Sequence, residues 1–437
     1  MRVGKTDPSP RSVAAPAHKA PGPHQLLDSP AVAERSDVVV IGGGQAGLAT
    51  SHELTQAGVD HLVLERGQVG QTWRGLWESF CLVTPNWSVQ LPGHPYDGDD
   101  PDGFMPRDDI VAYLERYAAA TGAPIREGTD VTSIEPRDGR FTVTTAAGTI
   151  DAGSVVVSTG AYQRPYRPPG AESLADDLLQ LDVRSYREPA QIPDGRVLVV
   201  GSGQSGCQIA EELHVAGRDV VLSCGRAPWL PRRFGGHDLV WWLVETGFLD
   251  VPVGALPAEA RLWSNPLASG RGGGHDLHLR TLHAMGVTLV GRFLGEQDGR
   301  FRFGDDLGGC VAWGDDRYRD FRAAATKLAA ARGLDPSDVL PDPEPLEPAP
   351  PAELDAVGFS TVVFTGGFRP SYLDLIDVPA AFDDLGFPIH TDGQSDAVPG
   401  LFFVGVHFLR KRKSSILYGV GEDAAVVAEG VAVRARS

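Results

Sequence analysis

The fold is decided by the stretch Asp37-Val-Val-Val-Ile-Gly-Gly-Gly-Gln-Ala-Gly47. Its first five residues form an apolar run that is typical of a buried parallel strand. Residues 48–57 then show the helical spacing of apolar side chains, and a second apolar run follows at 61–64. Together these segments predict one β-α-β unit whose first turn is made of glycine.

The three spaced glycines of this turn have separate physical tasks. Gly42 permits a tight turn, Gly44 lets a pyrophosphate approach the backbone, and Gly47 lets helix and strand pack closely. Glu65 ends the second strand, 23 residues after Gly42, where a carboxylate accepts both hydroxyls of an adenosine ribose. The alternatives are a strand–helix turn without a ligand and an exposed structural glutamate.

The chain contains this design twice. An apolar run at 196–200 leads into Gly201-Ser-Gly203-Gln-Ser-Gly206, a helical segment at 207–216 and a strand at 219–223. The position 23 residues after Gly201 is Cys224, so no carboxylate stands at the ribose position. The second site therefore differs from the first at the residue that contacts the ribose.

Cationic side chains replace the carboxylate in the second unit. Arg226, Arg232 and Arg233 follow the strand, and Ser223 precedes them, which suits a ribose 2′-phosphate. The sequence therefore predicts FAD in the first site and NADPH in the second, because NADPH is a soluble hydride donor whereas FAD can remain resident. The alternative is that these arginines form a solvated patch or pair with surplus carboxylates.

The remaining pattern predicts an α/β fold with two Rossmann-like dinucleotide-binding domains. Helices are expected at 108–121 and 421–433, strands at 130–134, 140–145, 154–158, 361–364 and 401–404, and crossings at the proline clusters 162–169 and 341–351. We predict a discontinuous FAD domain at 36–163 and 356–437, with an NADPH domain inserted at 164–355. Residues 1–35, with six prolines and no apolar periodicity, are expected to form a disordered tail.

Composition excludes several classes of protein. A net charge of −18 repels nucleic acid and anionic membranes. No run approaches the roughly eighteen apolar residues of a membrane span, and no secretory signal precedes the first strand, so we expect a cytoplasmic protein. The four cysteines lie far apart without Cys-x-x-Cys, so we expect neither a redox dithiol nor a metal site.

Further motifs carry a family likeness. They are Gly70-Gln-Thr-Trp73-Arg-Gly-Leu-Trp77, Leu82-Val-Thr-Pro-Asn86, Leu91-Pro-Gly93, Ser158-Thr-Gly160, Phe364-Thr-Gly-Gly-Phe368, Phe402-Phe-Val-Gly405 and residues 413–423. With the two glycine turns, they resemble the flavin-containing monooxygenase-like family (class B flavoprotein monooxygenases) over nearly the whole chain from Asp37. The resemblance implies that NADPH reduces FAD and that O₂ adds at flavin C4a. It also implies that retained NADP⁺ protects the hydroperoxide until a small molecule accepts oxygen at nitrogen, sulfur or carbon.

The resemblance also assigns residues. It places Gln71 and Trp73 on FAD and Asn86 at the reactive face, where its amide is the predicted catalytic donor; the alternative is an Asn that holds a turn after Pro85. The predicted cofactor contacts are Gly42, Gly44, Gln45, Ala46, Gly47, Glu65, Arg66, Gln71, Trp73, Thr84, Val131, Thr159, Gly160, Gly201, Gly203, Gln204, Ser205, Gly206, Ser223, Arg226, Arg232, Arg233, Thr365, Gly366 and Gly405.

One signature departs from the family. The family pattern His-Ser-x-x-Tyr ends at Tyr186 here, but Asp182 stands near the position of the histidine. Two alternatives to a monooxygenase therefore stay open: an NADPH oxidase or flavin-dependent reductase that inserts no oxygen, and a non-catalytic flavin-binding regulatory protein. An oligomer is possible.

Three further segments allow two interpretations each. Trp241 and Trp242 either wall a substrate pocket or anchor a helix in the core. His407 either tunes protonation near the flavin or is a structural histidine. The run at 410–413, Arg-Lys-Arg-Lys, invites a nucleic-acid interpretation, but it is short and isolated in an acidic chain. We therefore favour a solvated turn, or compensation of the charge of cofactor phosphates or reduced flavin.

Overall fold

The computed structural model describes residues 34–334, 341–346 and 350–436. The predicted tail at 1–35 lies outside these residues except for Glu34 and Arg35, and these two begin the first strand, β1 (Glu34–Ile41), rather than a tail. They pair with β8 (Gly148–Val157), with Glu34 opposite Ile150. The described chain from Glu34 onward forms one compact unit.

The first sheet has β1 at its centre. Its strand order is β21-β22-β23-β8-β1-β2-β5, and β1 runs parallel to both β2 and β8. The other strands are β2 (His61–Leu64), β5 (Ile125–Arg126), β6 (Val131–Arg137), β7 (Arg140–Thr145), β21 (His390–Thr391), β22 (Gln394–Ser395) and β23 (Leu401–Phe403). The predicted β-α-β unit and its antiparallel β6–β7 addition are therefore present.

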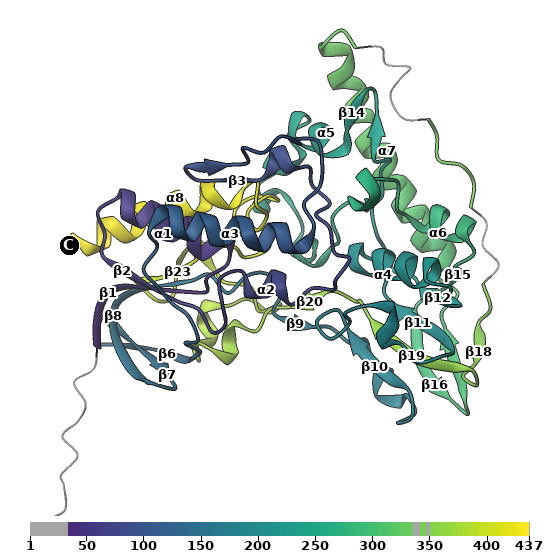
Figure 1. The fold of residues 1–437 in the computed structure, drawn as a ribbon, viewed down its shortest axis with the longest axis horizontal. Coiled ribbons are helices and arrows are strands. Elements are labelled where there is room, and N and C mark those ends of the chain that lie inside the picture. The colour runs from purple at the N-terminus through teal and green to yellow at the C-terminus, as the bar shows by residue number, and fades with distance from the viewer. Residues whose placement is uncertain (1–33, 335–340, 347–349, 437) are drawn as a thin grey trace, which may run out of the picture. The chain divides into compact units, whose positions relative to one another are not determined.

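One face of this sheet is covered by α1 (Gln45–Gln56), α3 (Arg107–Thr121) and α8 (Val420–Ala435), as Figure 1 shows. Their apolar faces form one core with β1: Leu48, Leu114 and Val427 are fully buried there together with Val38 and Val40. Burial of this kind stabilises by about 25 cal/mol per Å² of apolar surface, so the core fixes where the N-terminus of α1 points.

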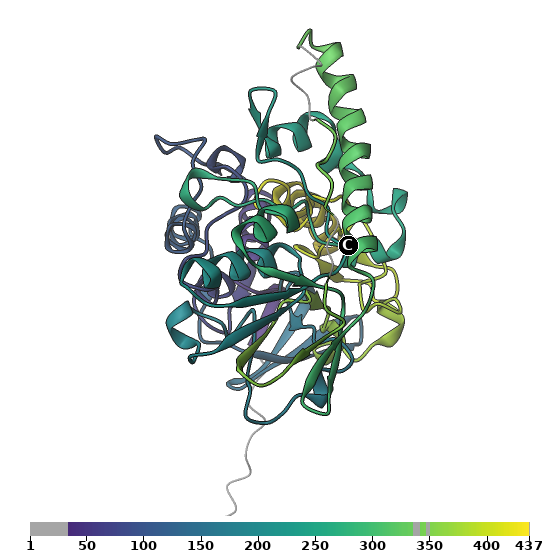
Figure 2. The ribbon, with the colours of Figure 1, turned by 90° about the vertical axis from the view of Figure 1, so that its right-hand side faces the viewer.

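The second sheet consists of five strands in the order β10-β19-β11-β12-β15, each parallel to its neighbours. They are β10 (Leu179–Asp182), β11 (Arg196–Val200), β12 (Val220–Ser223), β15 (Thr288–Val290) and β19 (Phe359–Phe364), with α4 (Gln204–Val215), α6 (Leu279–Met285) and α7 (Leu307–Ala331) around them. A small antiparallel sheet is formed by β16 (Phe293–Gln297), β17 (Arg300–Phe303) and β18 (Glu353–Asp355). Figure 2 shows α7 as the long helix that extends beyond its neighbours.

The position of β19 corrects the predicted crossings. The strand predicted at 361–364 was assigned to the returning FAD domain at 356–437, but as β19 it lies between β10 and β11 of the second sheet. In the described part of the proline cluster, Pro341 and Glu344 accept hydrogen bonds from Tyr318 and Arg280, so this part of the chain still lies beside α6 and α7 of the second sheet. The chain returns through β20 (Phe368–Arg369), which pairs antiparallel with the outgoing linker β9 (Arg164–Pro165).

Short elements complete the described chain. They are α2 (Gln71–Arg74), α5 (Leu239–Glu245), β3 (Gln90–Leu91), β4 (His94–Pro95), β13 (Arg233–Phe234) and β14 (His237–Asp238). Among the described residues, no helix is long and apolar enough to cross a membrane.

The N-cap of α6 makes stability depend on pH. His278 is 7% exposed and its side chain accepts a hydrogen bond from the Thr281 N–H. Burial, reinforced by the charge of Arg280, lowers the pKa of His278 from 6.5 to about 4. The unfolded chain therefore binds a proton that the folded chain does not, and stability is lost as the pH falls from 6.5 toward 4, by roughly 3 kcal/mol.

A replacement that caps without titrating tests this. In His278→Asn the side-chain oxygen can still cap the helix. Urea unfolding at pH 7 and pH 4.5 is expected to give a smaller loss of stability for the variant than for the wild type. Equal losses would assign the acid sensitivity to other groups.

Candidate functional site

The first glycine turn joins β1 to α1 and closes on the end of β8. Gly42 has φ +110°, which favours glycine, and a Cβ there would lie 2.6 Å from the carbonyl oxygen of Ser158. A Cβ on Gly47 would lie 1.8 Å from the Gly42 carbonyl oxygen. The Ser158 hydroxyl donates to the Ile41 carbonyl at 2.7 Å. In contrast, no atom lies within 4 Å of a Cβ built on Gly44, so the space beside the α1 N-terminus is open.

Glu65 lies beside this turn at the end of β2 and is 6% exposed. Its Oε2 accepts a hydrogen bond from the Gly43 N–H at 2.6 Å, and its Oε1 accepts one from the Gly67 N–H at 2.9 Å. An ionised carboxylate has about four acceptor sites, so capacity remains for ribose hydroxyls. The Thr129 N–H donates to the Glu65 carbonyl at 2.8 Å, which brings the start of β6 at Val131 toward this position.

The first residue of α1 links three distant segments. The Gln45 side chain accepts a hydrogen bond from Trp73 Nε1 at 2.9 Å and donates to the Ser415 carbonyl at 3.2 Å. Gly405 lies after β23, and a Cβ there would approach the Ala46 Cβ to 2.5 Å. The predicted contacts at 45, 46, 73 and 405 are therefore gathered around the N-terminus of α1.

Other predicted contacts of the first site are more peripheral. Arg66 is exposed and Thr84 is half-buried. Gln71 Oε1 accepts from the Gln68 N–H at 3.2 Å, within the turn that leads into α2. Thr159 accepts a hydrogen bond from Gln163 at 2.7 Å within the linker.

The second glycine turn repeats the first in detail. Gly201 has φ +115°, and a Cβ on Gly206 would lie 1.9 Å from the Gly201 carbonyl oxygen. The Thr365 hydroxyl donates to this carbonyl at 2.7 Å and to the Val200 carbonyl at 3.0 Å. Thr365 directly follows β19 as Ser158 directly follows β8, so a hydroxyl from the end of the neighbouring strand closes each turn.

Residues at the N-terminus of α4 mostly support the neighbouring loop. Gln204 forms two hydrogen bonds with the backbone of Ala268, donating at 2.5 Å and accepting at 3.1 Å. A Cβ on Gly203 would be 3.7 Å from the nearest atom, which is ordinary contact, and Ser205 is half-buried. A Cβ on Gly366 would approach the Tyr166 ring to 3.1 Å, so this glycine lets the linker pack closely.

The ribose end of the second site contains Cys224 and Ser223. Cys224 is 2% exposed, so a small buried thiol stands where the first site has Glu65. The Ser223 hydroxyl donates to the Gly291 carbonyl at 3.0 Å and accepts from the Phe293 N–H at 2.9 Å. The Ser223 hydroxyl therefore joins β12 to the segment after β15, and its single O–H donor is committed to the Gly291 carbonyl.

Arg232 contradicts its predicted role. Its guanidinium is 2% exposed and pairs with Asp238 through bonds of 2.8 and 2.9 Å. It donates to the Val83 carbonyl at 2.6 Å and lies 4.3 Å from the centre of the Phe104 ring. A buried and already neutralised guanidinium does not face a ribose phosphate, so Arg232 is a structural cross-link.

The other two arginines are exposed. Arg233 donates to the carbonyls of Gly274 at 3.1 Å and Gly273 at 2.9 Å. Arg226 forms no ion pair within the described residues and stands two residues after Cys224. Arg226 is therefore the predicted cation that stays free for a 2′-phosphate.

Asn86 begins a 3-10 turn (Asn86–Ser88) and is 6% exposed. Its amide nitrogen donates to the Asp100 carbonyl at 2.8 Å, which holds the following loop. Its Oδ1 is buried without a hydrogen-bond partner. The amide thus has one of its two donor hydrogens committed to Asp100 and an unsatisfied acceptor, and the hydrogen bond to Asp100 agrees with the turn interpretation.

Asp182 has a local structural role. Its Oδ1 accepts from the backbone N–H groups of Arg184 at 2.8 Å and Ser185 at 3.2 Å. A carboxylate can accept both bonds, whereas a neutral imidazole offers one acceptor. Tyr186, which matches the family signature, is buried and donates to Glu212 at 2.9 Å. The departure at Asp182 therefore stabilises the turn after β10.

The tryptophan pair divides between the two interpretations. Trp242 is fully buried and donates to the Phe234 carbonyl at 3.0 Å, as a core anchor does. Trp241 is half-buried and stacks on His237 with ring centres 3.8 Å apart, while Arg332 covers it at 5.4 Å. The contacts of both rings are with other side chains or the backbone of the protein, and none of them indicates a substrate pocket.

The basic run at 410–413 is not a solvated turn. Its residues are half-buried or buried, and three backbone hydrogen bonds join it to residues 249–253. The Val253 N–H donates to the Arg410 carbonyl, and the N–H groups of Arg412 and Lys413 donate to the carbonyls of Val251 and Leu249. His407 comes just before the run, and its Nδ1 atom lies 3.3 Å from the hydroxyl oxygen of Ser415. Burial, and then the charge of Arg412, lowers the pKa of His407 to about 4, so its imidazole is neutral near pH 7.

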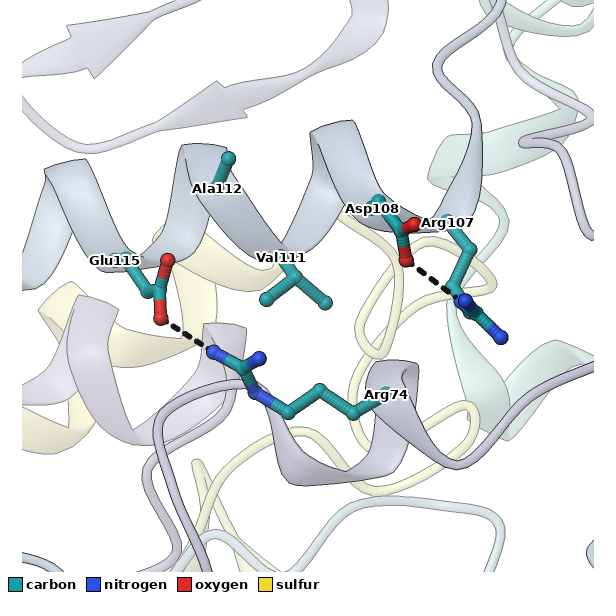
Figure 3. A pocket seen from close by; sticks show the side chains of 6 residues that line it. All are labelled: Arg74, Arg107, Asp108, Val111, Ala112 and Glu115. Atoms are coloured by element: carbon teal, nitrogen blue, oxygen red, sulfur yellow. Dashed lines mark hydrogen bonds and ion pairs between the residues drawn. The ribbon is translucent and has the colours of Figure 1, made fainter. Parts of the chain in front are cut away.

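A hollow of about 310 Å³ lies between α2 and α3, and no residue of the glycine turns lines it (Figure 3). Arg74 of α2 pairs with Glu115 of α3 across it, whereas Arg107 pairs with its neighbour Asp108 at the start of α3. Both guanidinium groups already have carboxylate partners, so the hollow presents no unpaired positive charge that would bind an anionic cofactor.

Comparison with known proteins gives a consistent assignment. The family model described as pyridine nucleotide-disulphide oxidoreductase matches residues 39–238. An uncharacterized CzcO-like oxidoreductase of Geobacillus kaustophilus is 32% identical over 390 residues, which cover 89% of this chain and 96% of that protein. The flavin-containing monooxygenase of Stenotrophomonas maltophilia has a TM-score of 0.65 at 21% identity, covering 92% of this chain and 99% of that one. A crystal structure of OTEMO in complex with FAD and NADP gives 0.54 at 16% identity, covering 92% and 86%.

Proposed function

Because the chain belongs to the CzcO-like oxidoreductases of the flavin-containing monooxygenase-like family, we propose that it is an NADPH-dependent, FAD-containing monooxygenase of a small molecule. One observation carries the choice of cofactors. The two glycine turns share the positive φ of their first glycine and the close backbone approach at their third. Glu65 stands at the ribose position of the first turn, whereas the second has Cys224 there, followed by Arg226, which has no ion-pair partner among the described residues. A carboxylate suits ribose hydroxyls and a cation suits a 2′-phosphate.

The residues at the first turn fit FAD. The open space beside Gly44 and the N-terminus of α1 suit the pyrophosphate, and the Gln45 side chain fixes Trp73 beside it. When bound, FAD supplies hydride acceptance from NADPH and reaction with O₂. The chain's task is to align the two nucleotides and to exclude water from the space between them.

The main alternative is an NADPH oxidase or reductase that inserts no oxygen. Electron transfer to a disulfide through a dithiol of this chain has no support, because the chain has no Cys-x-x-Cys motif and Cys207, Cys224 and Cys310 are buried away from a disulfide substrate. Burial raises the pKa of the Cys207 and Cys224 thiols, which makes them poor nucleophiles. A reductase would therefore pass electrons to O₂ or to an external acceptor.

Isotopic oxygen separates the candidates. The purified FAD-loaded enzyme is supplied with NADPH, ¹⁸O₂ and panels of amines, thioethers and carbon substrates, and products are analysed by mass spectrometry. Incorporation of one ¹⁸O atom with stoichiometric NADPH loss supports the proposal. Quantitative H₂O₂ with every panel would establish an oxidase, and no NADPH oxidation with bound FAD would favour a regulatory protein.

Cofactor choice is tested at Arg226. Arg226→Ser is expected to raise the KM for NADPH by roughly 10- to 100-fold, because a charge-assisted hydrogen bond contributes about 1.5–3 kcal/mol. The KM for NADH should change little. Arg233→Ser is the matched control, since Arg233 is equally exposed but donates to Gly273 and Gly274. Equal effects of Arg226→Ser on both nucleotides would remove Arg226 from the 2′-phosphate site.

A further inference from the structure

Arg412 differs from the other cations of the run 410–413. Arg410 pairs with Asp392 and Asp423, and Lys411 and Lys413 both pair with Asp250 and Glu422. Arg412 has no carboxylate partner within the described residues, and its Nε is buried without a hydrogen-bond partner. The run thus contains one uncompensated guanidinium among four cations.

The surroundings of Arg412 are apolar and neutral. Its guanidinium carbon lies 4.2 Å from the ring centre of Phe248 and 5.5 Å from that of Phe408. Phe408 in turn stacks on His407 with ring centres 4.2 Å apart. Burial lowers the pKa of Arg412, and the neutral His407 imidazole offers no negative charge. A desolvated cation of this kind is costly unless an anion joins it.

This position connects to the first nucleotide site. His407 contacts Ser415 through its side chain, and the Ser415 carbonyl accepts the Gln45 hydrogen bond at the start of α1. Phe248 comes from the segment after α5, whereas Phe408 follows β23. Arg412 therefore lies between elements of the two nucleotide-binding units, and such junctions are preferred places for small-molecule sites.

We propose that Arg412 binds the carboxylate of an organic acid whose apolar or aromatic part packs against the partly exposed rings of Phe248 and His407. The guanidinium fork matches a carboxylate bidentately, and aromatic faces tolerate both guanidinium and apolar ligand atoms. This inference rests on the proposed function and gives it a substrate class: the enzyme oxygenates a carboxylic acid at an atom of its apolar part.

Direct binding tests the acid site. The FAD-loaded full-length enzyme is titrated with phenylacetate and with phenylacetamide by calorimetry, anaerobically and without NADPH, so that no turnover occurs. The wild type is expected to bind the acid about tenfold more tightly than the amide. Arg412→Gln should bring the two affinities together, and Arg412→Lys should retain part of the preference because the point charge remains. Lys411→Gln removes a neighbouring positive charge that is already paired, and should keep the wild-type ratio.

Each result has one meaning. The preference for the acid in the wild type and its loss in Arg412→Gln support the proposal. Equal affinities in the wild type overturn it, as does an unchanged ratio in Arg412→Gln. Loss of FAD from both Arg412 variants would also overturn it, because the guanidinium would then serve the cofactor. Since these measurements involve neither NADPH nor O₂, an enzyme that binds the acid but incorporates no ¹⁸O would contradict the proposed function alone.

Discussion

Alanine at Gly47 is expected to destroy the first glycine turn, whereas alanine three residues earlier should leave the fold intact and remove the cofactor. The Cβ of Gly47→Ala would lie 1.8 Å from the Gly42 carbonyl oxygen, and this backbone atom cannot rotate away. The free energy of unfolding should fall by roughly 3 kcal/mol or more. Denaturant unfolding of apo-protein measures this loss.

Gly44→Ala separates folding from binding. No atom lies within 4 Å of its Cβ, and Gly44 has φ −88°, which alanine adopts readily. Stability should therefore stay within about 1 kcal/mol of the wild type. The methyl group would occupy the space expected for the pyrophosphate, so FAD affinity should fall roughly a hundredfold, or about 2.8 kcal/mol. Unchanged FAD affinity in Gly44→Ala would argue that the pyrophosphate lies elsewhere.

The second large effect is expected at Arg232. Arg232→Ala would leave Asp238 unpaired and the Val83 carbonyl without its donor, and breaking a buried ion pair costs about 3–5 kcal/mol. Thermal unfolding of the variant should begin well below that of the wild type, while its preference for NADPH over NADH is retained. Arg233→Ala is the control, because this exposed side chain reaches two loop carbonyls and its removal should cost less than 1 kcal/mol.

A selective loss of NADPH affinity in Arg232→Ala, without lower stability, would contradict the structural assignment. It would restore the 2′-phosphate role that the sequence pattern predicts. The two arginines thus give opposite expected signatures: Arg226 affects nucleotide choice and Arg232 affects stability.

The glycine turns were predictable because their determinants are local. Strand, glycine spacing and helix lie within about twenty residues, and β2, β7 and β11 begin and end where the apolar runs do. The hydroxyls that close the turns, from Ser158 and Thr365, could not be found by that spacing. Each lies more than a hundred residues from its acceptor, and the only signal is that both end an apolar run directly before a glycine or a threonine–glycine pair.

The roles of charged residues were less predictable because they depend on distant partners. In the sequence, Arg226 and Arg232 are both cations that follow a strand. In the structure only Arg232 donates to the Val83 carbonyl, 149 residues away, and to the carboxylate of Asp238. The domain boundary failed for a similar reason. An apolar strand at 359–364 suits either sheet, and its partners β10 and β11 decide which one.

The place of β19 between β10 and β11 has a consequence for biosynthesis. A ribosome delivers β10 and β11 almost 160 residues before it delivers the strand that separates them, and β23 of the first sheet follows later still. Neither sheet can reach its final strand order while the chain is still short. The nascent polypeptide therefore exposes unpaired strand edges for most of its translation. We expect folding of the two sheets to be slow and the chain to be most prone to aggregation during this period.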